Sequence, residues 1–248
     1  MPELKINRWC KQKTPHMLSL VFLAFLVCPP GAKAARPFVT DDARITSPES
    51  CQLESWARSY RSSTEFWALP ACNPFGNLEF TLGVGHAKYQ TYATSDYVFQ
   101  LKTLFKELTP GGMGWGLAAG SVMHPGIAPG PNLLGNQYVY VPISFASRDA
   151  RQAIHVNVGA LHDKARSRRL ATLGLGLEHA QTDRMQWIAE TFGEQGRSPF
   201  FQAGIRYALI KNILQIDATL GGEAGGASTS RWFSLGLRYT PEGVLRQR

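Results

Sequence analysis

The feature of this 248-residue chain that most constrains its fold is an alternation of apolar and polar side chains. In residues 78–85 (LEFTLGVG), Leu, Phe, Leu and Val hold one parity, and Glu, Thr and two Gly hold the other. A period of two predicts a β-strand between two unlike environments. The same plan returns in residues 172–178, 214–220 and 233–239. The uniformly apolar parity is typical of a lipid-facing wall, and the variable, Gly-rich and sometimes charged parity is typical of a lumen.

Strands of this kind are expected along most of the chain. No long apolar run and no helical period of useful length interrupts them, and about nine to eleven residues suffice for a tilted strand to cross a bilayer. We therefore predict an all-β fold, a single antiparallel transmembrane β-barrel of outer-membrane type with about 12 strands. The expected strands are 51–60, 64–72, 77–88, 96–107, 114–122, 138–146, 153–162, 169–180, 185–193, 199–208, 213–221 and 231–239.

The connections are expected to alternate in length. With the N-terminus in the periplasm, the compact links 73–76, 108–113, 147–152, 181–184 and 209–212 become periplasmic turns. The links 89–95, 123–137, 163–168, 194–198 and 222–230 then become longer outer loops, and the short turn at 62–63 is an exception. Short periplasmic turns and longer outer loops are typical of outer-membrane barrels. Aromatic residues near the strand ends favour interfacial girdles, with ordinary β-propensity as the alternative.

The start of the chain predicts export. Four basic residues precede an apolar run at 17–28, and Ala32, Lys33 and Ala34 offer a small-x-small cleavage site. We expect a signal peptide at 1–34, a periplasmic lead-in at 35–50, the barrel at 51–239 and a C-terminal tail at 240–248. Localisation in a Gram-negative outer membrane implies outer-membrane lipid and the barrel-assembly machinery as partners.

Charge argues against a nucleic-acid partner. Residues 1–34 contain five basic residues and one acidic residue, so the formal net charge falls from +8 to +4 when they are removed. The basicity is thus largely that of the targeting signal. No basic stripe with interleaved aromatic residues is left to bind nucleic acid.

Cysteine usage agrees with an oxidising compartment. Cys10 and Cys28 leave with the signal, and the mature chain keeps Cys51 and Cys72 at the outer ends of two strands joined by a turn. We predict a disulfide across the base of this hairpin. A metal site is the weaker interpretation and no cofactor is expected, because the histidines are scattered without ligand spacing: His86, His124, His155, His162 and His179.

Several segments resemble a known family. They are 36–44 (RPFVTDDAR), 51–56 (CQLESW), 69–74 (LPACNP), 100–102 (QLK) and 174–178 (GLGLE). Together they resemble a proteobacterial family of outer-membrane transporters named for the meta-cleavage pathway of phenol degradation. The resemblance spans most of the mature chain and implies a β-barrel that moves small molecules, with aromatic molecules as candidates. It brings no catalytic residue to carry over.

The polar parity collects charged residues as candidates for a lumen lining. Five acids and five bases are expected to point inward, and neighbouring strands suggest the pairs Glu79 with Lys106, Arg206 with Asp217, and Arg238 with Glu54. Two compatible interpretations are a structural ion-pair network and a mixed-charge constriction that selects small solutes. The candidates are Glu54, Arg58, Glu79, Lys102, Lys106, Glu178, Glu190, Arg206, Asp217 and Arg238.

An enzyme is the alternative from another class, because outer-membrane lipid or ester hydrolases are also barrels. His155 and Asn157 share a strand face, and Ser144 and Ser147 lie on or beside the preceding strand, so a Ser/His/Asn set is conceivable. No motif fixes it, and no catalytic residue is predicted. Asp41 with Asp42 is more typical of a solvated loop pair than of a cation site.

The sequence thus favours a channel or transporter for small, aromatic or amphiphilic, solutes. A structural barrel with a closed lumen is a further alternative. The connection at 123–137 holds three Pro and three Gly residues, and we expect it to control access to the pore. Solute identity and oligomeric state do not follow from these patterns.

Overall fold

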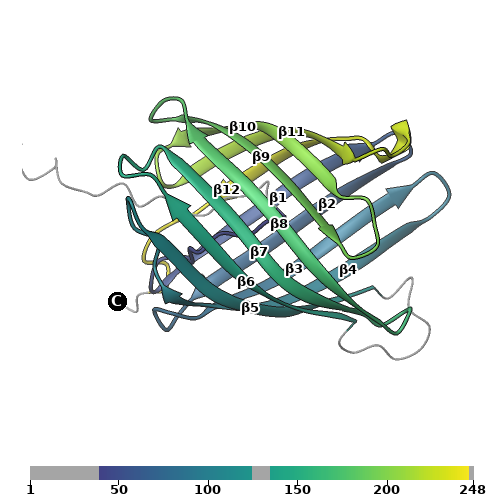
Figure 1. Cartoon of the computed structure of the whole chain (residues 1–248), viewed down its shortest axis with the longest axis horizontal. Helices are drawn as coiled ribbons and strands as arrows, with labels where there is room; N and C mark the ends of the chain where they lie inside the picture. The colour runs from purple at the N-terminus through teal and green to yellow at the C-terminus, as the bar shows by residue number, and fades with distance from the viewer. Residues whose placement is uncertain (1–38, 125–134, 246–248) are drawn as a thin grey trace, which may run out of the picture. The chain divides into compact units, whose positions relative to one another are not determined.

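The computed structural model describes residues 39–124 and 135–245. These residues form 12 antiparallel strands that close into one barrel, each strand paired with its neighbours in sequence and β1 paired with β12 (Figure 1). Among the described residues, no helix is long and apolar enough to cross a membrane. The strands are β1 (Ser50–Tyr60), β2 (Ser63–Asn73), β3 (Glu79–Tyr89), β4 (Ala93–Lys106), β5 (Met113–Met123), β6 (Asn136–Ala146), β7 (Gln152–Asp163), β8 (Arg168–Ala180), β9 (Met185–Glu194), β10 (Phe200–Ile210), β11 (Leu214–Glu223) and β12 (Trp232–Tyr239).

The predicted fold class is confirmed. Every expected strand is present, and most boundaries agree within two residues; the largest difference is at β4, which begins at Ala93. The expected signal peptide at 1–34 lies outside the described residues.

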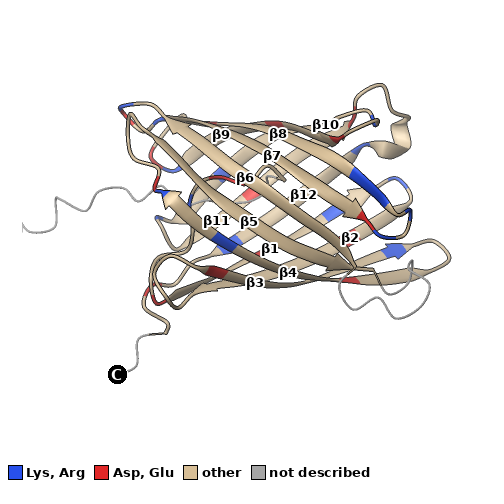
Figure 2. Cartoon of the chain, turned by 60° about the horizontal axis from the view of Figure 1, so that its bottom comes forward, with Lys and Arg blue, Asp and Glu red and all other residues tan. Residues whose placement is uncertain are grey.

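The two parities of the strands face opposite environments, as predicted. Leu175, Ile216 and Leu235 point outward and are 48%, 39% and 54% exposed. The inward neighbours of Ile216 and Leu235 are polar and buried, Asp217 and Ser234. In Figure 2 the strands are uncharged over most of their length, and the charged residues appear as isolated segments. An apolar outer face around a polar interior is the pattern of a barrel that spans a lipid bilayer.

The expected difference in loop length is weaker than the sequence suggested. We call the end at which β1 begins and β12 ends the base, and the opposite end the mouth. Four mouth connections are as short as the base turns, at 61–62, 90–92, 164–167 and 195–199. Tyr89 and Tyr92 explain the second, since a backbone hydrogen bond of 2.8 Å joins them and their rings stack. The long mouth connections are 124–135, which lies mostly outside the described residues, and 224–231.

The predicted disulfide is present at the base. Cys51 and Cys72 are direct partners in the β1–β2 register, with 4.0 Å between their Cα atoms. The bridge therefore joins the two strands at the end where the hairpin is open.

Candidate functional site

The lumen receives nine of the ten charged residues predicted to line it. Seven of them are buried, with at most 5% exposed: Glu79, Lys102, Glu178, Glu190, Arg206, Asp217 and Arg238. Glu54 and Arg58 are partly buried. Lys106 contradicts the prediction, because the β4–β5 register shifts between Leu104 and Lys106 and leaves this side chain exposed. A bulge of this kind breaks the period of two.

The predicted pairing of these charges is correct in part. Arg238 and Glu54 are register partners, with 3.8 Å between Nε and Oε1. The pairing of Glu79 with Lys106 is wrong, because the bulge moves Lys106 away and the register partner of Glu79 is Lys102.

Arg206 shows how the tilt of the strands changes the expected partners. Arg206 and Asp217 are register partners, as expected. The arginine also places Nη1 2.8 Å from Glu178, which lies two strands away on β8. An inward side chain can thus contact a residue two strands away along the inner surface of the barrel.

The segment before β1 lies inside the barrel. We call residues 39–46 the lumen plug. The backbone N–H groups of Val39 and Thr40 donate to the two carboxylate oxygens of Glu190, at 2.8 and 2.7 Å. The N–H of Thr46 donates to Glu79 at 2.7 Å. The plug therefore satisfies buried acids of two strands, β3 and β9, with its own backbone donors.

The middle of the plug is held by its Asp41. One carboxylate oxygen of Asp41 lies 2.7 Å from Lys102 Nζ, and the other accepts the Tyr140 hydroxyl at 2.7 Å. The Asn157 amide, with its nitrogen toward the Asp41 carbonyl, makes two further hydrogen bonds of 2.8 and 2.7 Å with the Asp41 backbone. Opposite charges and paired amides leave the Asp41 backbone and side chain well satisfied in the lumen.

A glycine of the wall makes room for the plug. A Cβ added to Gly174 of β8 would lie 2.6 Å from Thr40 Oγ1 and 3.2 Å from Thr40 Cβ. Any side chain here would collide with the plug. Gly174 is thus required by its contact with Thr40, a residue more than 130 positions away in the sequence.

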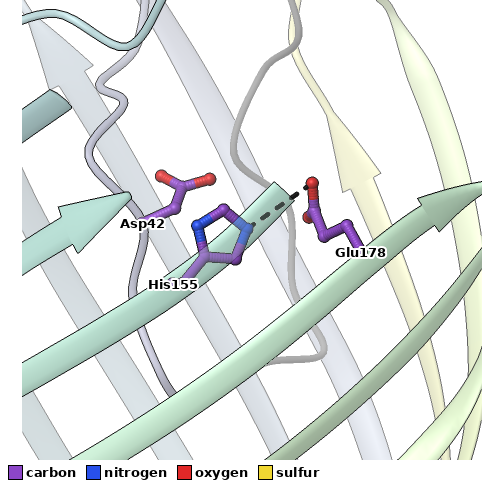
Figure 3. A group of neighbouring side chains, drawn as sticks. All are labelled: Asp42, His155 and Glu178. Carbon is purple, nitrogen blue, oxygen red and sulfur yellow. Dashed lines mark ion pairs between the residues drawn. The ribbon is translucent and has the colours of Figure 1, made fainter. Parts of the chain in front are cut away.

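Three titratable groups of the plug and wall come together. Possible ligand atoms of Asp42, His155 of β7 and Glu178 of β8 lie within 4.8 Å of one another (Figure 3). The Arg44 guanidinium lies 2.9 Å from Asp42 and 3.2 Å from Glu178, so the cationic partner of both carboxylates is already an arginine. The side chains of this group fit an ion-pair network better than a metal site, since a divalent ion would compete with Arg44.

Ser144 and His155 of the conceivable Ser/His/Asn set do lie together, but they hold the plug. Ser144 Oγ lies 2.8 Å from His155 Nδ1, and His155 Nε2 lies 3.6 Å from Glu178. The N–H of Ala43 donates to Ser144 Oγ at 2.8 Å, and the serine and histidine are both 0% exposed. A nucleophile must reach its substrate. Ser144 and His155 therefore anchor the plug in this structure.

The other members of that set lie elsewhere. Asn157 binds Asp41, as described above, and Ser147 belongs to the β6–β7 turn, where its hydroxyl donates to Asp149.

A cavity of about 610 Å³ lies between the plug and the mouth. Val39, Asp41 and Arg44 of the plug line it on one side, and Glu194 and Arg197 line it near the mouth. It also passes beside the plug along β1–β3, where Gln52, Ala71 and Glu79 contribute. The volume is in the range of sites for small molecules.

The expected periplasmic lead-in at 35–50 is corrected for its described part. Thr40, Asp42, Ala43 and Thr46 are all at most 4% exposed and contact the wall. The sequence resembled an exposed loop because it is polar and irregular. Those polar groups have partners on strands that are distant in the chain, and no local pattern in 39–46 reveals them.

The fold is a closed antiparallel barrel of 12 strands with charged side chains in its lumen, an architecture shared with solved outer-membrane porins. The KdgM porin in complex with disordered oligogalacturonate has the same fold, with a TM-score of 0.56, 9% identity, and coverage of 76% of this chain and 98% of that chain. The NanC porin gives a TM-score of 0.55 and 7% identity, with the same coverage. At such low identity the likeness shows the fold alone.

The chain belongs to the family described as uncharacterised conserved protein UCP029691, whose family model matches residues 22–239. No curated protein matches the sequence. The family match carries no link to phenol degradation, so that part of the resemblance has no support beyond the quoted residues.

Proposed function

We propose that this protein is an outer-membrane channel for small solutes, with the lumen plug narrowing the path. The observation that carries the proposal is the cavity, lined by charged, aromatic and aliphatic side chains, that runs from the mouth to the plug inside a closed, outwardly apolar barrel. The shared fold with porins supports it. The aromatic or amphiphilic character of the solute belongs to the same proposal, since aromatic and charged side chains both line the cavity.

The plug makes this a restricted channel. It crosses the lumen near the base and bonds to β3, β4, β6 and β9. The plug thus narrows the passage, and we expect larger solutes to pass only when the plug shifts. The charged residues around it are the groups that a passing solute would meet, which is the role proposed for the predicted lumen candidates.

A disulfide lock tests the proposal. Thr40 and Gly174 approach closely enough for a Thr40→Cys, Gly174→Cys pair to bridge, because a Cβ on residue 174 would lie 3.2 Å from Thr40 Cβ. In planar bilayers, we expect low conductance from the locked protein and at least a severalfold increase after reduction. The wild-type protein, treated with the same reductant, controls for loss of the bridge between Cys51 and Cys72.

The two parts of the proposal fail differently. Equal conductance before and after reduction, with the bridge shown by mass spectrometry, would refute the role of the plug. Silence of the wild-type, locked and reduced proteins, all correctly inserted, would refute the channel and favour a structural barrel.

A further inference from the structure

Several glycines on the lumen parity lie directly opposite aromatic residues of the neighbouring strand. In each case a Cβ on the glycine would run into ring atoms, so the ring lies flat over the glycine and against the wall. Covering of strand glycines by aromatic side chains is a known device of β-sheets. The pairs are Gly85 with Trp67, Gly120 with Tyr138, and Gly221 with Trp232.

The first of these rings forms a platform on β1–β3. Atoms of the six-membered ring of Trp67 lie 2.6–2.7 Å from the Cβ position of Gly85. Trp56, its register partner on β1, has its ring parallel to within 6° at a centroid distance of 5.6 Å. Both tryptophans line the cavity. The stacked pair therefore forms part of the cavity lining.

A second platform lies on β5–β6 and lines the same cavity. The Tyr138 ring covers Gly120, and the Tyr140 ring is parallel to it within 18° at 6.0 Å. The two hydroxyls lie 2.9 and 3.1 Å from Gln100 Oε1, which fixes the rings at their edges. The platform therefore presents apolar faces bordered by hydrogen-bonding groups.

The charges that line the cavity are compensated within the protein. Acids and bases lie next to each other on the wall or across the plug, so they offer local dipoles and hydrogen bonds rather than a net field of one sign. The pairs are Lys102 with Asp41 at 2.7 Å, Arg58 with Glu65 at 4.0 Å, and Arg238 with Glu54 at 3.8 Å. A solute carrying a full charge would have to displace an existing partner.

From these contacts we infer that the cavity is a binding site for uncharged solutes that contain a ring, which stack on the Trp56–Trp67 and Tyr138–Tyr140 platforms. The inference rests on the proposed function, because it names the class of solute that the channel takes up. The shared chemistry is an apolar ring face with polar substituents, which phenols provide with a planar ring and sugars with the C–H face of a puckered ring. Flat rings recognise such faces through offset stacking and apolar contact.

Calorimetric titration of the full chain in detergent tests the inference, with protein-free detergent as the blank. The ring-containing probes are p-cresol and maltose, and their open-chain counterparts are hexanol and mannitol. We expect a ring probe to bind at least severalfold more tightly than its counterpart. We expect Trp67→Ala to weaken that binding about two- to tenfold, the range for loss of one aromatic pair.

The matched control is Trp187→Ala, which removes the same ring from the outer wall, where it is 51% exposed. We expect this variant to leave the affinity unchanged. Gly85→Ala is the second variant, because its Cβ moves the Trp67 ring off the wall without removing it, and we expect it to change the affinity too.

The two ring probes distinguish between aromatic solutes and sugars. Binding of p-cresol alone assigns aromatic solutes, and binding of maltose alone assigns sugars. The inference is wrong if hexanol and mannitol bind as tightly as the ring probes, or if the Trp67 and Trp187 variants behave alike. Binding does not depend on conduction, so a silent barrel that still binds rings would refute the channel and leave this site in place.

Discussion

At the scale of single residues, the plug depends on a few groups that each serve several partners. Burial disfavours the charge of Arg44. The carboxylates of Asp42 in the plug and Glu178 on β8 outweigh this effect, because both lie within 3.2 Å of the guanidinium. Its pKa is therefore raised above the ordinary value, and it stays charged at every physiological pH. Such a cation neutralises the acids around it and removes the need for a metal ion there.

His124 is the residue whose protonation we expect to respond to pH. It follows β5 at the mouth, and its Nδ1 lies 2.9 Å from an Asp96 carboxylate oxygen. The neighbouring Asp96 carboxylate outweighs partial burial and raises the pKa of His124 above the ordinary value of about 6.5. The contribution of the pair to stability is fully present below that value and is lost as the pH rises through the raised pKa.

We predict that an NMR titration of His124 gives a pKa above that of a free histidine. Asp96→Asn should lower it toward the ordinary value, because the carboxylate charge is lost. An unchanged His124 titration in the Asp96 variant would contradict the assignment.

At the scale of the strands, each element has one face for lipid and one for the lumen. On β8, Leu175 is outward and 48% exposed, and Thr172 is inward and lines the cavity. We predict that Leu175→Arg lowers the free energy of unfolding by about 2–4 kcal/mol, the cost of a cation near the bilayer midplane. Thr172→Arg should have a much smaller effect, because the cavity has room for the side chain and acidic residues line it.

Urea-dependent unfolding in lipid vesicles measures both values on the same strand. Equal losses for the two variants would mean that the parity is wrong or that the barrel does not reside in a bilayer.

At the scale of the whole molecule, the plug joins strands from most of the barrel and couples its position to the pore. Lys102 is 3% exposed and lies 2.7 Å from Asp41 of the plug, and 3.8 Å from Asp42. We predict that Lys102→Glu raises conductance and shifts selectivity toward cations. The variant removes a buried ion pair, worth about 3–5 kcal/mol when one partner is lost, and adds repulsion against the plug.

Lys211→Glu provides the matched control. It makes the same charge change in the β10–β11 turn, where Lys211 is 52% exposed and pairs with Asp183. Reversal potentials in a salt gradient report the selectivity of both variants. If the Lys102 and Lys211 variants gave the same conductance and selectivity, the lumen charges would have no part in permeation.

The sequence by itself determined the barrel. Alternation of side chains is a local property, because successive residues of a strand point to opposite faces. It was enough to place Leu175, Ile216 and Leu235 on the wall and nine charged residues in the lumen. Local bulges are the limit of this reasoning, since the register shift that exposes Lys106 is set by pairing with β5.

Only the tertiary structure decided what fills the lumen. The plug binds to Glu79, Ser144 and Glu190, which belong to strands far apart in the chain. Closure of the barrel places them around the same narrow space, and the same closure sets the tilt by which Arg206 reaches Glu178. A polar segment and an exposed loop have the same composition, and they differ only in the distant partners that their hydrogen bonds find.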